Sequence, residues 1–276
     1  MLVRIGHSPD PDDAFMVWAF AADRIDTRGL ELELVPADIQ TLNEWALEGR
    51  LEVTALSAAA YPVVQDRYLL LPHGASMGAG YGPIVVARRV LSRDELRRTT
   101  IAVPGLLTTA YLTLRMYLGG DFEHVAMPFD EILPAVAEGR VDAGLLIHEG
   151  QLTYAASGVG KCVDLGEWWL LETGLPLPLG VNTIRRDLGS EVIASVSAVL
   201  QEAIRIGLSE RTEALAYAHR FGRDLDDQTI DRFVGMYVND LTCDVGDEGK
   251  QAVRELLTRA EALGVYDAPV RVEFAV

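Results

Sequence analysis

The sequence predicts an α/β fold organised in two domains. Its 276 residues exceed what one ordinary compact core holds, so two domains of about 100–150 residues each are expected. Strand-like and helix-like segments alternate from the first residues onward, which favours a largely parallel sheet with helices on its faces. A short apolar run at residues 143–147, typical of a buried strand, ends on His148.

The first domain is predicted to begin with this alternation. Its expected elements are strands at residues 2–6, 30–36, 51–57 and 83–88, and helices over residues 14–20, over 38–49 and from residue 58. The helix over 38–49 opens with the capping residue Asp38 and ends on Gly49. Residues 74–82 are rich in glycine but match neither the dinucleotide fingerprint nor the Walker pattern, so we expect a tight turn there.

A stiff acidic loop follows the first strand and reads His7-Ser8-Pro9-Asp10-Pro11-Asp12-Asp13. Prolines and carboxylates suit a first helical turn, because unpaired N–H groups and the helix dipole favour negative charge there. We expect this role for Asp10, Asp12 and Asp13. The alternatives are a ligand-facing loop or a divalent metal site, and a metal site would need further oxygen ligands.

The second domain is predicted to run from residue 91 to residue 179. A short helix over residues 91–98 precedes a new strand at residues 101–103. Thr108 or Thr109 then opens a helix, where a hydroxyl group and free N–H groups either cap the helix or bind an anion. A helix over residues 129–139 leads into the strand that ends on His148.

The remaining chain is expected to return to the first domain, which then comprises residues 1–90 and 180–276. Residues 175–182 form a stiff apolar segment that can carry the chain back. The segments that follow show helical periodicity and are expected to pack on the first domain; they cover residues 188–217, 228–237 and 249–263.

Three predicted element ends converge on a cleft between the two domains. Ser57 ends one strand, His148 ends another, and the Thr108–Ala110 turn opens a helix. Ligands of open α/β sheets bind beyond the carboxyl ends of the strands, and domain interfaces are frequent ligand sites. Histidine is the side chain best suited to accept a proton near neutral pH. The alternative is that His148 only caps its strand.

Composition and charge exclude several classes of function. Lys and Arg number 24 against 41 Asp and Glu, a net charge of −17 that argues against nucleic acid or an anionic membrane as partner. No apolar run reaches the roughly 20 residues that span a bilayer. The first residues lack a secretory signal, so we expect a cytoplasmic protein. The predicted cleft between the domains indicates a small-molecule substrate. The two cysteines, Cys162 and Cys243, are too few for a disulfide framework or a structural zinc site.

A series of different short motifs, each present once, lies in a fixed order within the part of the chain from about residue 4 to about residue 265. They are Ser8-Pro9-x-Pro-x-Asp13-x-Phe15, Thr41-Leu42-Asn43 with Trp45-Ala46-Leu47-Glu48-Gly49, Leu56-Ser57-x-Ala59-x-Tyr61, Gly82-Pro83, Val103-Pro104-Gly105 with Thr108-Thr109-Ala110, Gly144-Leu145-x-Ile147-His148-Glu149, Asp164-Leu165-Gly166-x-Trp168-Trp169 and Gly174-Leu175-Pro176-Leu177-Pro178-Leu179-Gly180. In these motifs the sequence resembles the menaquinone-biosynthesis proteins of the futalosine route, and among them the 1,4-dihydroxy-6-naphthoate synthase branch.

The resemblance implies a two-domain, periplasmic-binding-protein-like (type II) fold with a ligand cleft between the domains. It implies a lyase that splits cyclic dehypoxanthine futalosine into 1,4-dihydroxy-6-naphthoate without a metal or organic cofactor. The family's proton acceptor falls on His148. Its substrate contacts fall on the Ala55-Leu56-Ser57 segment and on Thr109-Ala110.

The chain departs from the family pattern in the first loop and the third strand. The family commonly has Cys, Asn and Thr where this chain has Asp10, Asp12 and Ala14, and Lys where it has Ala55. These changes would weaken binding of an anionic substrate by about 1–3 kcal/mol in a partly buried site. Two alternatives to the lyase are a non-catalytic binding protein for a small polar ligand and a related pathway enzyme such as a chorismate dehydratase.

Overall fold

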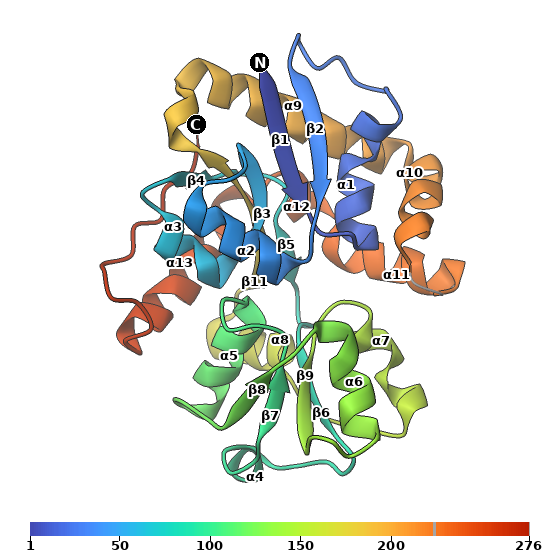
Figure 1. Ribbon diagram of the computed structural model, residues 1–276, viewed down its shortest axis with the longest axis vertical. Coiled ribbons are helices and arrows are strands. Elements are labelled where there is room, and N and C mark those ends of the chain that lie inside the picture. The colour runs from blue at the N-terminus through green and yellow to red at the C-terminus, as the bar shows by residue number, and fades with distance from the viewer. Residues whose placement is uncertain (223–224, 276) are drawn as a thin grey trace.

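The computed structural model describes residues 1–222 and 225–275 and shows two lobes joined by two crossings (Figure 1). The first lobe holds both chain termini, and the middle of the chain forms the second lobe. The chain leaves the first lobe between β5 (Ser76–Gly78) and β6 (Ile84–Ala87) and returns through α8 (Leu165–Thr173) to β11 (Leu177–Arg185). The predicted boundary after residue 90 therefore assigns β6 to the first domain, whereas β6 pairs within the second sheet.

The sheet of the first lobe has the strand order β2-β1-β3-β11-β4, with β5 beside β11. The remaining strands of this sheet are β1 (Leu2–His7), β2 (Glu31–Pro36), β3 (Val53–Ser57) and β4 (Tyr68–Leu70). β1 is parallel to β2 and β3, but β11 is antiparallel to β3, β4 and β5. The prediction of a largely parallel sheet is wrong here. The chain enters β11 from the second lobe, at the edge of the sheet where β3 ends, so β11 runs antiparallel to β3.

Local signals explain the first helices. α1 (Pro11–Ala21) begins with a proline and carries Asp12 and Asp13 in its first turn, as predicted. α2 (Ile39–Glu48) begins where the Asp38 side chain accepts a hydrogen bond from the Thr41 N–H. It ends at Gly49, whose φ of 69° lies in the left-handed region that glycine adopts at low cost.

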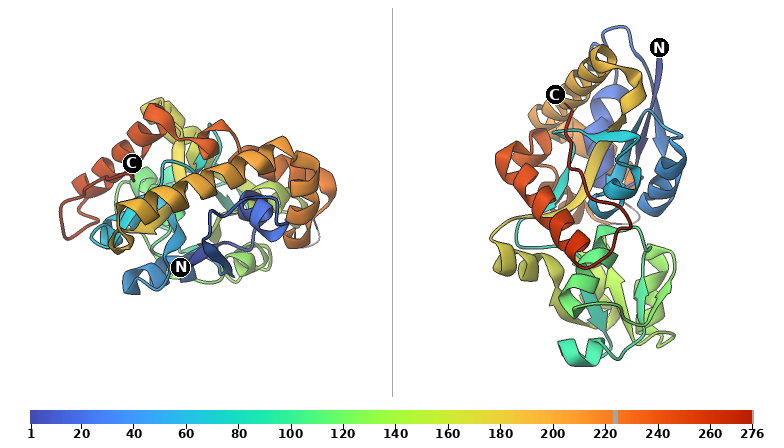
Figure 2. Two further views of the ribbon diagram at one scale, coloured as in Figure 1. Left: turned by 90° about the horizontal axis from the view of Figure 1, so that it is seen from above. Right: turned by 90° about the vertical axis from the view of Figure 1, so that its left-hand side faces the viewer.

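The helices of the first lobe cover its sheet. Besides α1 and α2, they are the short η1 (Ala58–Ala60) and α3 (Tyr61–Val64) after β3, and η3 (Arg186–Leu188), α9 (Ser190–Ser209), α10 (Arg211–Ala218), η4 (His219–Phe221), α11 (Asp227–Tyr237), α12 (Asp240–Cys243) and α13 (Gly246–Ala262) after β11. The predicted helix over residues 188–217 is in fact split into α9 and α10, because Glu210 leaves the helical conformation (φ −108°, ψ 46°). By length and composition α9 could cross a membrane, but it packs across α1 and buries its apolar side in the core (Figure 2).

The sheet of the second lobe has the order β10-β6-β9-β7-β8. Besides β6, its strands are β7 (Ile101–Val103), β8 (His124–Ala126), β9 (Ala143–Leu146) and β10 (Gly160–Asp164). The helices of this lobe besides α8 are α4 (Arg93–Leu96), α5 (Thr109–Leu118), α6 (Phe129–Ala137), α7 (Gly150–Thr153) and the short η2 (Tyr154–Ser157). β6 is antiparallel to β9 and β10, so this sheet is mixed as well.

Two segments predicted to be irregular contain strands. Residues 175–182, expected to be a connecting segment, mostly belong to β11, and the glycine-rich residues 74–82 contain β5. β11 tolerates Pro178 because the pairing with β5 shifts register between Pro178 and Gly180. The two segments therefore pair with each other where the chain crosses between the lobes.

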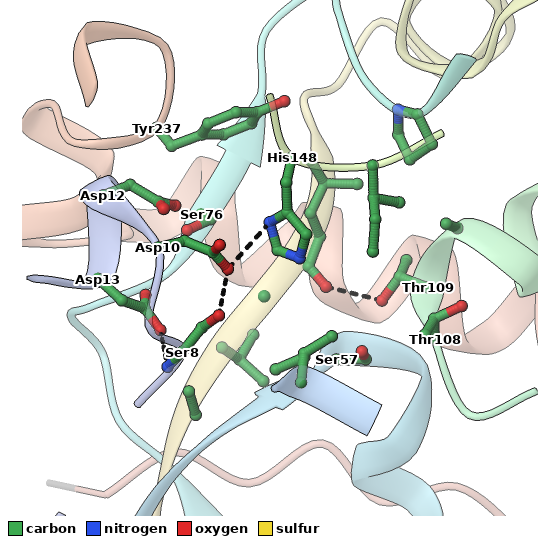
Figure 3. Close-up of a pocket in the computed structure, with 18 of the residues that line it drawn as sticks. Ser8, Asp10, Asp12, Asp13, Ser57, Ser76, Thr108, Thr109, His148 and Tyr237 are labelled. Atoms are coloured by element: carbon green, nitrogen blue, oxygen red, sulfur yellow. Dashed lines mark hydrogen bonds and ion pairs between the residues drawn. The ribbon is translucent and has the colours of Figure 1, made fainter. Parts of the chain in front are cut away.

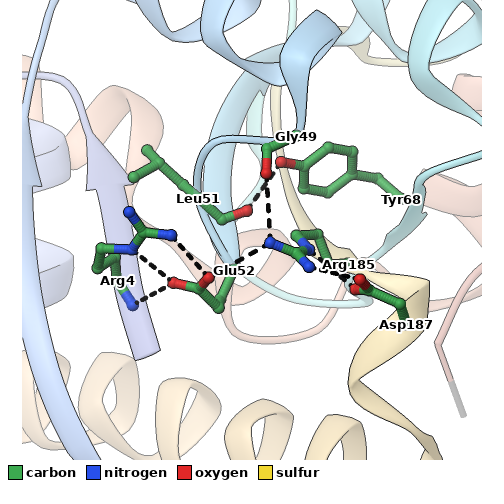
Figure 4. A network of polar contacts seen from close by, with 7 residues as sticks. All are labelled: Arg4, Gly49, Leu51, Glu52, Tyr68, Arg185 and Asp187. Carbon is green, nitrogen blue, oxygen red and sulfur yellow. Dashed lines mark hydrogen bonds and ion pairs between the residues drawn. The ribbon is translucent and has the colours of Figure 1, made fainter. Parts of the chain in front are cut away.

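A network of arginines and one glutamate ties together strands at the end of the first sheet far from the second lobe (Figure 4). Glu52, just before β3, accepts hydrogen bonds from the backbone N–H, Nε and Nη2 of Arg4 on β1. Arg185, at the end of β11, lies 3.4 Å from the same carboxylate. Burial alone would raise the pKa of Glu52, but the hydrogen bonds and charge of Arg4 hold it below its ordinary value.

Candidate active site

A cleft between the lobes contains about 740 Å³ of space, part of it open to solvent. Its walls come from the loop between β1 and α1, the end of β3, the start of α5, the turn after β9, and from β11 and α11 (Figure 3). The carboxyl ends of β1 and β3 meet the second lobe at this cleft, which is the usual place of ligands in open α/β sheets.

His148 follows β9 and projects into the cleft. Its φ of 53° lies in the left-handed region, a conformation that is strained by about 1–2 kcal/mol for a residue with a Cβ. The imidazole packs against the ring of Phe129 in an edge-on arrangement with 4.9 Å between centroids. The surrounding structure therefore fixes the histidine side chain at an unusual turn, as is common at functional sites.

Asp10 of the first lobe meets His148 of the second lobe. The Oδ2 atom of Asp10 lies 3.3 Å from the Nδ1 atom of His148, and the Asp10 side chain is 2% exposed. The Ser8 hydroxyl donates a hydrogen bond to the same Oδ2 atom. Asp10 has an extended backbone (φ −111°, ψ 157°), as expected for a residue before a proline.

Asp12 and Asp13 also line the cleft, so the first loop both starts α1 and faces the ligand space. Burial, and after it the charges of Asp13 and Asp10, raises the pKa of Asp12 to about 8. Burial likewise raises the pKa of Asp13, although its carboxylate accepts a hydrogen bond of 2.6 Å from the Ser8 N–H. Asp12 is therefore mostly neutral at pH 7, and its Oδ1 atom makes no hydrogen bond with the described residues.

Ser57 forms part of a neutral polar wall. The Asn43 side chain donates to the Ser57 hydroxyl at 3.1 Å and accepts from the Ser57 N–H at 2.9 Å. Asn43 is fully buried on α2, so it holds the end of β3 in a fixed orientation. The Ser57 hydroxyl keeps its own proton to donate to a ligand in the cleft.

The N-terminus of α5 closes the other side of the cleft. Thr108 caps this helix, since its hydroxyl accepts the Tyr111 N–H. The Thr109 hydroxyl donates to the Leu179 carbonyl at 2.7 Å and accepts from the Ala59 N–H at 3.2 Å. The hydroxyl of Thr109 thus joins the two lobes, and the backbone N–H groups at the helix start are the better donors for an anionic ligand.

Tyr237 on α11 and Gln151 on α7 complete the cleft on a third side. The Tyr237 hydroxyl and the Gln151 side-chain amide form a hydrogen bond of 2.9 Å, which is another contact between the lobes. Burial raises the pKa of Tyr237, so its phenol is neutral. Among the described residues that line the cleft there is no Lys or Arg, and no described group of three His, Cys, Asp or Glu side chains could hold a metal ion.

Comparison with known proteins assigns the family. A family model described as menaquinone biosynthesis matches residues 3–262. The chain belongs to this menaquinone biosynthesis family. Two curated relatives are named 1,4-dihydroxy-6-naphthoate synthase: a protein of Thermus thermophilus, 46% identical over 95% of both chains, and one of Streptomyces coelicolor, 39% identical over 96% of this chain and 95% of the relative.

Solved structures of similar proteins show the fold of this menaquinone biosynthesis family member. A crystal structure of a protein from Archaeoglobus fulgidus is 46% identical and covers 96% of this chain and 98% of its own, with a TM-score of 0.92. The alkanesulfonate-binding protein of Xanthomonas axonopodis is 14% identical, with a TM-score of 0.72 over 98% of this chain and 96% of its own. The predicted two-domain, periplasmic-binding-protein-like fold is therefore confirmed.

The structure brings together most of the residues that the menaquinone biosynthesis resemblance assigns to the site. His148, Ala55, Ser57, Thr109 and Ala110 all line the cleft. The Leu56 side chain lies instead in the core of the first lobe, because successive side chains of a strand point to opposite faces. The roles of these residues in binding and catalysis remain predictions.

Several residues that line the cleft of this family member, or support its lining from behind, are not predicted from the sequence. Asn43 stood in a quoted motif, but nothing in the motif indicated that it holds Ser57. Tyr237 and Gln151 lie far apart in the chain and meet because α11 packs against β5, where the chain crosses between the lobes. The Asp10–His148 contact was also missed, since it depends on how the two lobes face each other.

Proposed function

We propose that this protein is a lyase that converts cyclic dehypoxanthine futalosine into 1,4-dihydroxy-6-naphthoate, with His148 as the general base. The observation that carries this proposal is the imidazole at the strand end, fixed on one side and open to the cleft on the other. The names of two relatives at 46% and 39% identity support the reaction.

The polar groups around His148 fit the proposed chemistry. The base removes a proton from the substrate, and a positioned histidine typically contributes about 10²–10⁴-fold to such a step. The charge that then develops on oxygen, and the substrate carboxylate, need hydrogen-bond donors. The Ser57 hydroxyl and the N–H groups at the start of α5 can supply them without a basic side chain.

The neutral state of Asp12 reduces the expected conflict with an anionic substrate. A protonated aspartic acid has nearly the shape of asparagine, which the family commonly has at this position, and it can donate one hydrogen bond. The first loop then carries less negative charge than its three carboxyls suggest. We further propose that the enzyme works in the cytoplasm and needs neither metal nor organic cofactor.

The test is to incubate the purified protein with cyclic dehypoxanthine futalosine and to identify the products by mass spectrometry, with and without a metal chelator. We expect 1,4-dihydroxy-6-naphthoate in both samples. Binding of the substrate without turnover, measured by calorimetry, would instead favour a binding protein, which the same two-lobed fold also serves. Conversion of chorismate would favour the dehydratase alternative.

A further inference from the structure

We propose that Asp10 is a positioning residue for His148. Its carboxylate holds the neutral imidazole with the proton on Nδ1, which leaves Nε2 as the basic atom that faces the cleft. The inference rests on the proposed function for its catalytic meaning, but the state of the imidazole can be tested without turnover.

The Asp10 side chain turns away from the helix that it precedes. Asp10 occupies the N-cap position of α1, where an aspartate ordinarily accepts a helix N–H. In the described part of the chain its carboxylate makes no such capping bond. It accepts the Ser8 hydroxyl and faces the Nδ1 atom of His148 at 3.3 Å instead. Starting the helix therefore does not account for this side chain.

The chemistry of the Asp10–His148 contact selects one tautomer of the imidazole. A neutral imidazole has one N–H donor and one bare nitrogen that accepts. A carboxylate oxygen also accepts, so it favours the tautomer with hydrogen on the nearer nitrogen, here Nδ1. Nε2 is then bare and points away from Asp10, toward the side of the cleft where Ser57 and Thr109 lie (Figure 3).

Both partners of the Asp10–His148 contact are held in place by their surroundings. Pro9 and Pro11 stiffen the loop around Asp10, and the Asp10 side chain is almost fully buried. The Phe129 ring and the strained backbone fix the orientation of His148. Asp142, a sequence neighbour at the other end of β9, lies 3.9 Å from Arg88 on the surface and does not compete for this role.

The contact also links catalysis to the closure of the lobes. Asp10 precedes α1 in the first lobe, and His148 follows β9 in the second. The other polar groups that face the imidazole region are Asp12 on α1, Gln151 on α7 and Tyr237 on α11. Among the carboxylates of the described cleft residues, only that of Asp10 lies within 4.0 Å of a nitrogen of this imidazole. The imidazole is therefore held in this orientation only when the two lobes are in contact.

The experiment is nitrogen-15 NMR of the histidine rings in the whole protein without substrate, at a pH where the rings are neutral. His148→Asn identifies the His148 signals among those of the five histidines. We expect the His148 proton on Nδ1 in the wild type and mainly on Nε2 in Asp10→Asn. Ser8→Ala, which removes the hydroxyl that helps to hold the Asp10 carboxylate in place, should give a smaller shift in the same direction.

The matched control is Asp227→Asn, which removes a carboxylate 3.2 Å from the partly exposed His219, a residue that does not line the cleft. It should change the His219 signals and leave those of His148 unchanged. A His148 ring that carries its proton on Nε2 in the wild type, or that keeps the same tautomer in both Asp10→Asn and Ser8→Ala, would overturn the inference.

Kinetics then connects the tautomer to catalysis. With cyclic dehypoxanthine futalosine as substrate, Asp10→Asn should lower kcat by about 10²–10⁴-fold and change KM by less than about 3-fold, as expected for a histidine held in the wrong tautomer. A lower kcat without a tautomer change would contradict the positioning role. A tautomer change in a protein that does not turn over this substrate would contradict the proposed function alone.

Discussion

Two buried carboxyl groups of the first lobe, those of Glu52 and Asp12, differ in whether positively charged side chains lie beside them. Glu52 lies between Arg4 and Arg185, which supply hydrogen bonds and positive charge (Figure 4). Asp12 lies in the cleft, where the described lining residues include no Lys or Arg (Figure 3). The pKa of Glu52 is held below its ordinary value, whereas that of Asp12 is raised to about 8.

The difference separates a structural carboxylate from a functional one. A buried charge that only stabilises the fold is paired with opposite charge, as Glu52 is. A buried carboxyl without such a partner destabilises the folded state unless it takes up a proton, and perturbed groups of this kind cluster at functional sites. The first loop therefore keeps an unfavourable arrangement that the fold alone does not require.

The largest expected effect on stability comes from Asp12→Asn. The folded state holds the Asp12 proton up to about pH 8, whereas an unfolded Asp releases it near pH 3.8. The contribution of this proton to the free energy of unfolding is fully present below pH 3.8 and is lost as the pH rises toward 8. The loss over this range is about 2–5 kcal/mol. Asp12→Asn should remove this loss. The free energy of unfolding of the variant should therefore exceed that of the wild type by an amount that grows from pH 5 to pH 8.5.

Urea denaturation followed by circular dichroism at several pH values measures this effect. Some pH dependence should persist in Asp12→Asn, because Asp13 also has a raised pKa. Stability curves of wild type and variant that run parallel from pH 5 to pH 8.5 would show that Asp12 is ionised in the folded protein, contrary to the account.

Glu52→Gln should act in the opposite direction. It removes the charge that accepts three hydrogen bonds from Arg4, and we expect a loss of about 1–3 kcal/mol in the free energy of unfolding at neutral pH. Because the folded pKa of Glu52 lies below its ordinary value of 4.5, its contribution is present above that pH and is lost on acidification. The same urea titrations at pH 7 and pH 3 check this, and an unchanged midpoint at pH 7 would contradict it.

Ser57→Ala tests the neutral wall of the cleft. Loss of one hydroxyl donor should raise KM by about 2–10-fold and leave kcat nearly unchanged. Ser209→Ala, at an exposed serine on α9, is a matched control and should leave both constants unchanged. Steady-state kinetics measures both, and an unchanged KM in Ser57→Ala would remove Ser57 from the substrate site.

The smallest effect is expected at the edge of the arginine network. Asp187 pairs with Arg185, but its side chain is 64% exposed to solvent. Asp187→Asn should change the free energy of unfolding by less than about 0.5 kcal/mol. A loss as large as that of Glu52→Gln would mean that Arg185 depends on Asp187 for its position, and Glu52 would then not be the carboxylate on which the network depends.

Local signals in the sequence predicted most elements correctly. The capping Asp38 and the terminal Gly49 mark α2, and Thr108 caps α5 as one of two expected residues. Apolar runs identified β1, β3 and β9. The direction of β11 was not predictable in this way, because its pairing with β3 depends on a chain that leaves for the other lobe and returns.

The candidate site was predictable where single positions carry the chemistry. Strand ends and a helix start pointed to His148, Ser57 and Thr109, which all line the cleft. The hydrogen bonds that occupy the Thr109 hydroxyl, the support of Ser57 by Asn43 and the contact of Asp10 with His148 are all tertiary. Interactions between residues distant in the chain leave no local pattern, so only the structure reveals them.

The most direct test of the central claim compares wild type and His148→Asn in single-turnover reactions with cyclic dehypoxanthine futalosine, with binding measured in parallel by calorimetry. If His148 is the general base, the variant should bind the substrate with a Kd within about 3-fold of the wild type. It should form 1,4-dihydroxy-6-naphthoate at least about 10²-fold more slowly. Product formation by His148→Asn at a near-normal rate would contradict the assignment of His148 as the base.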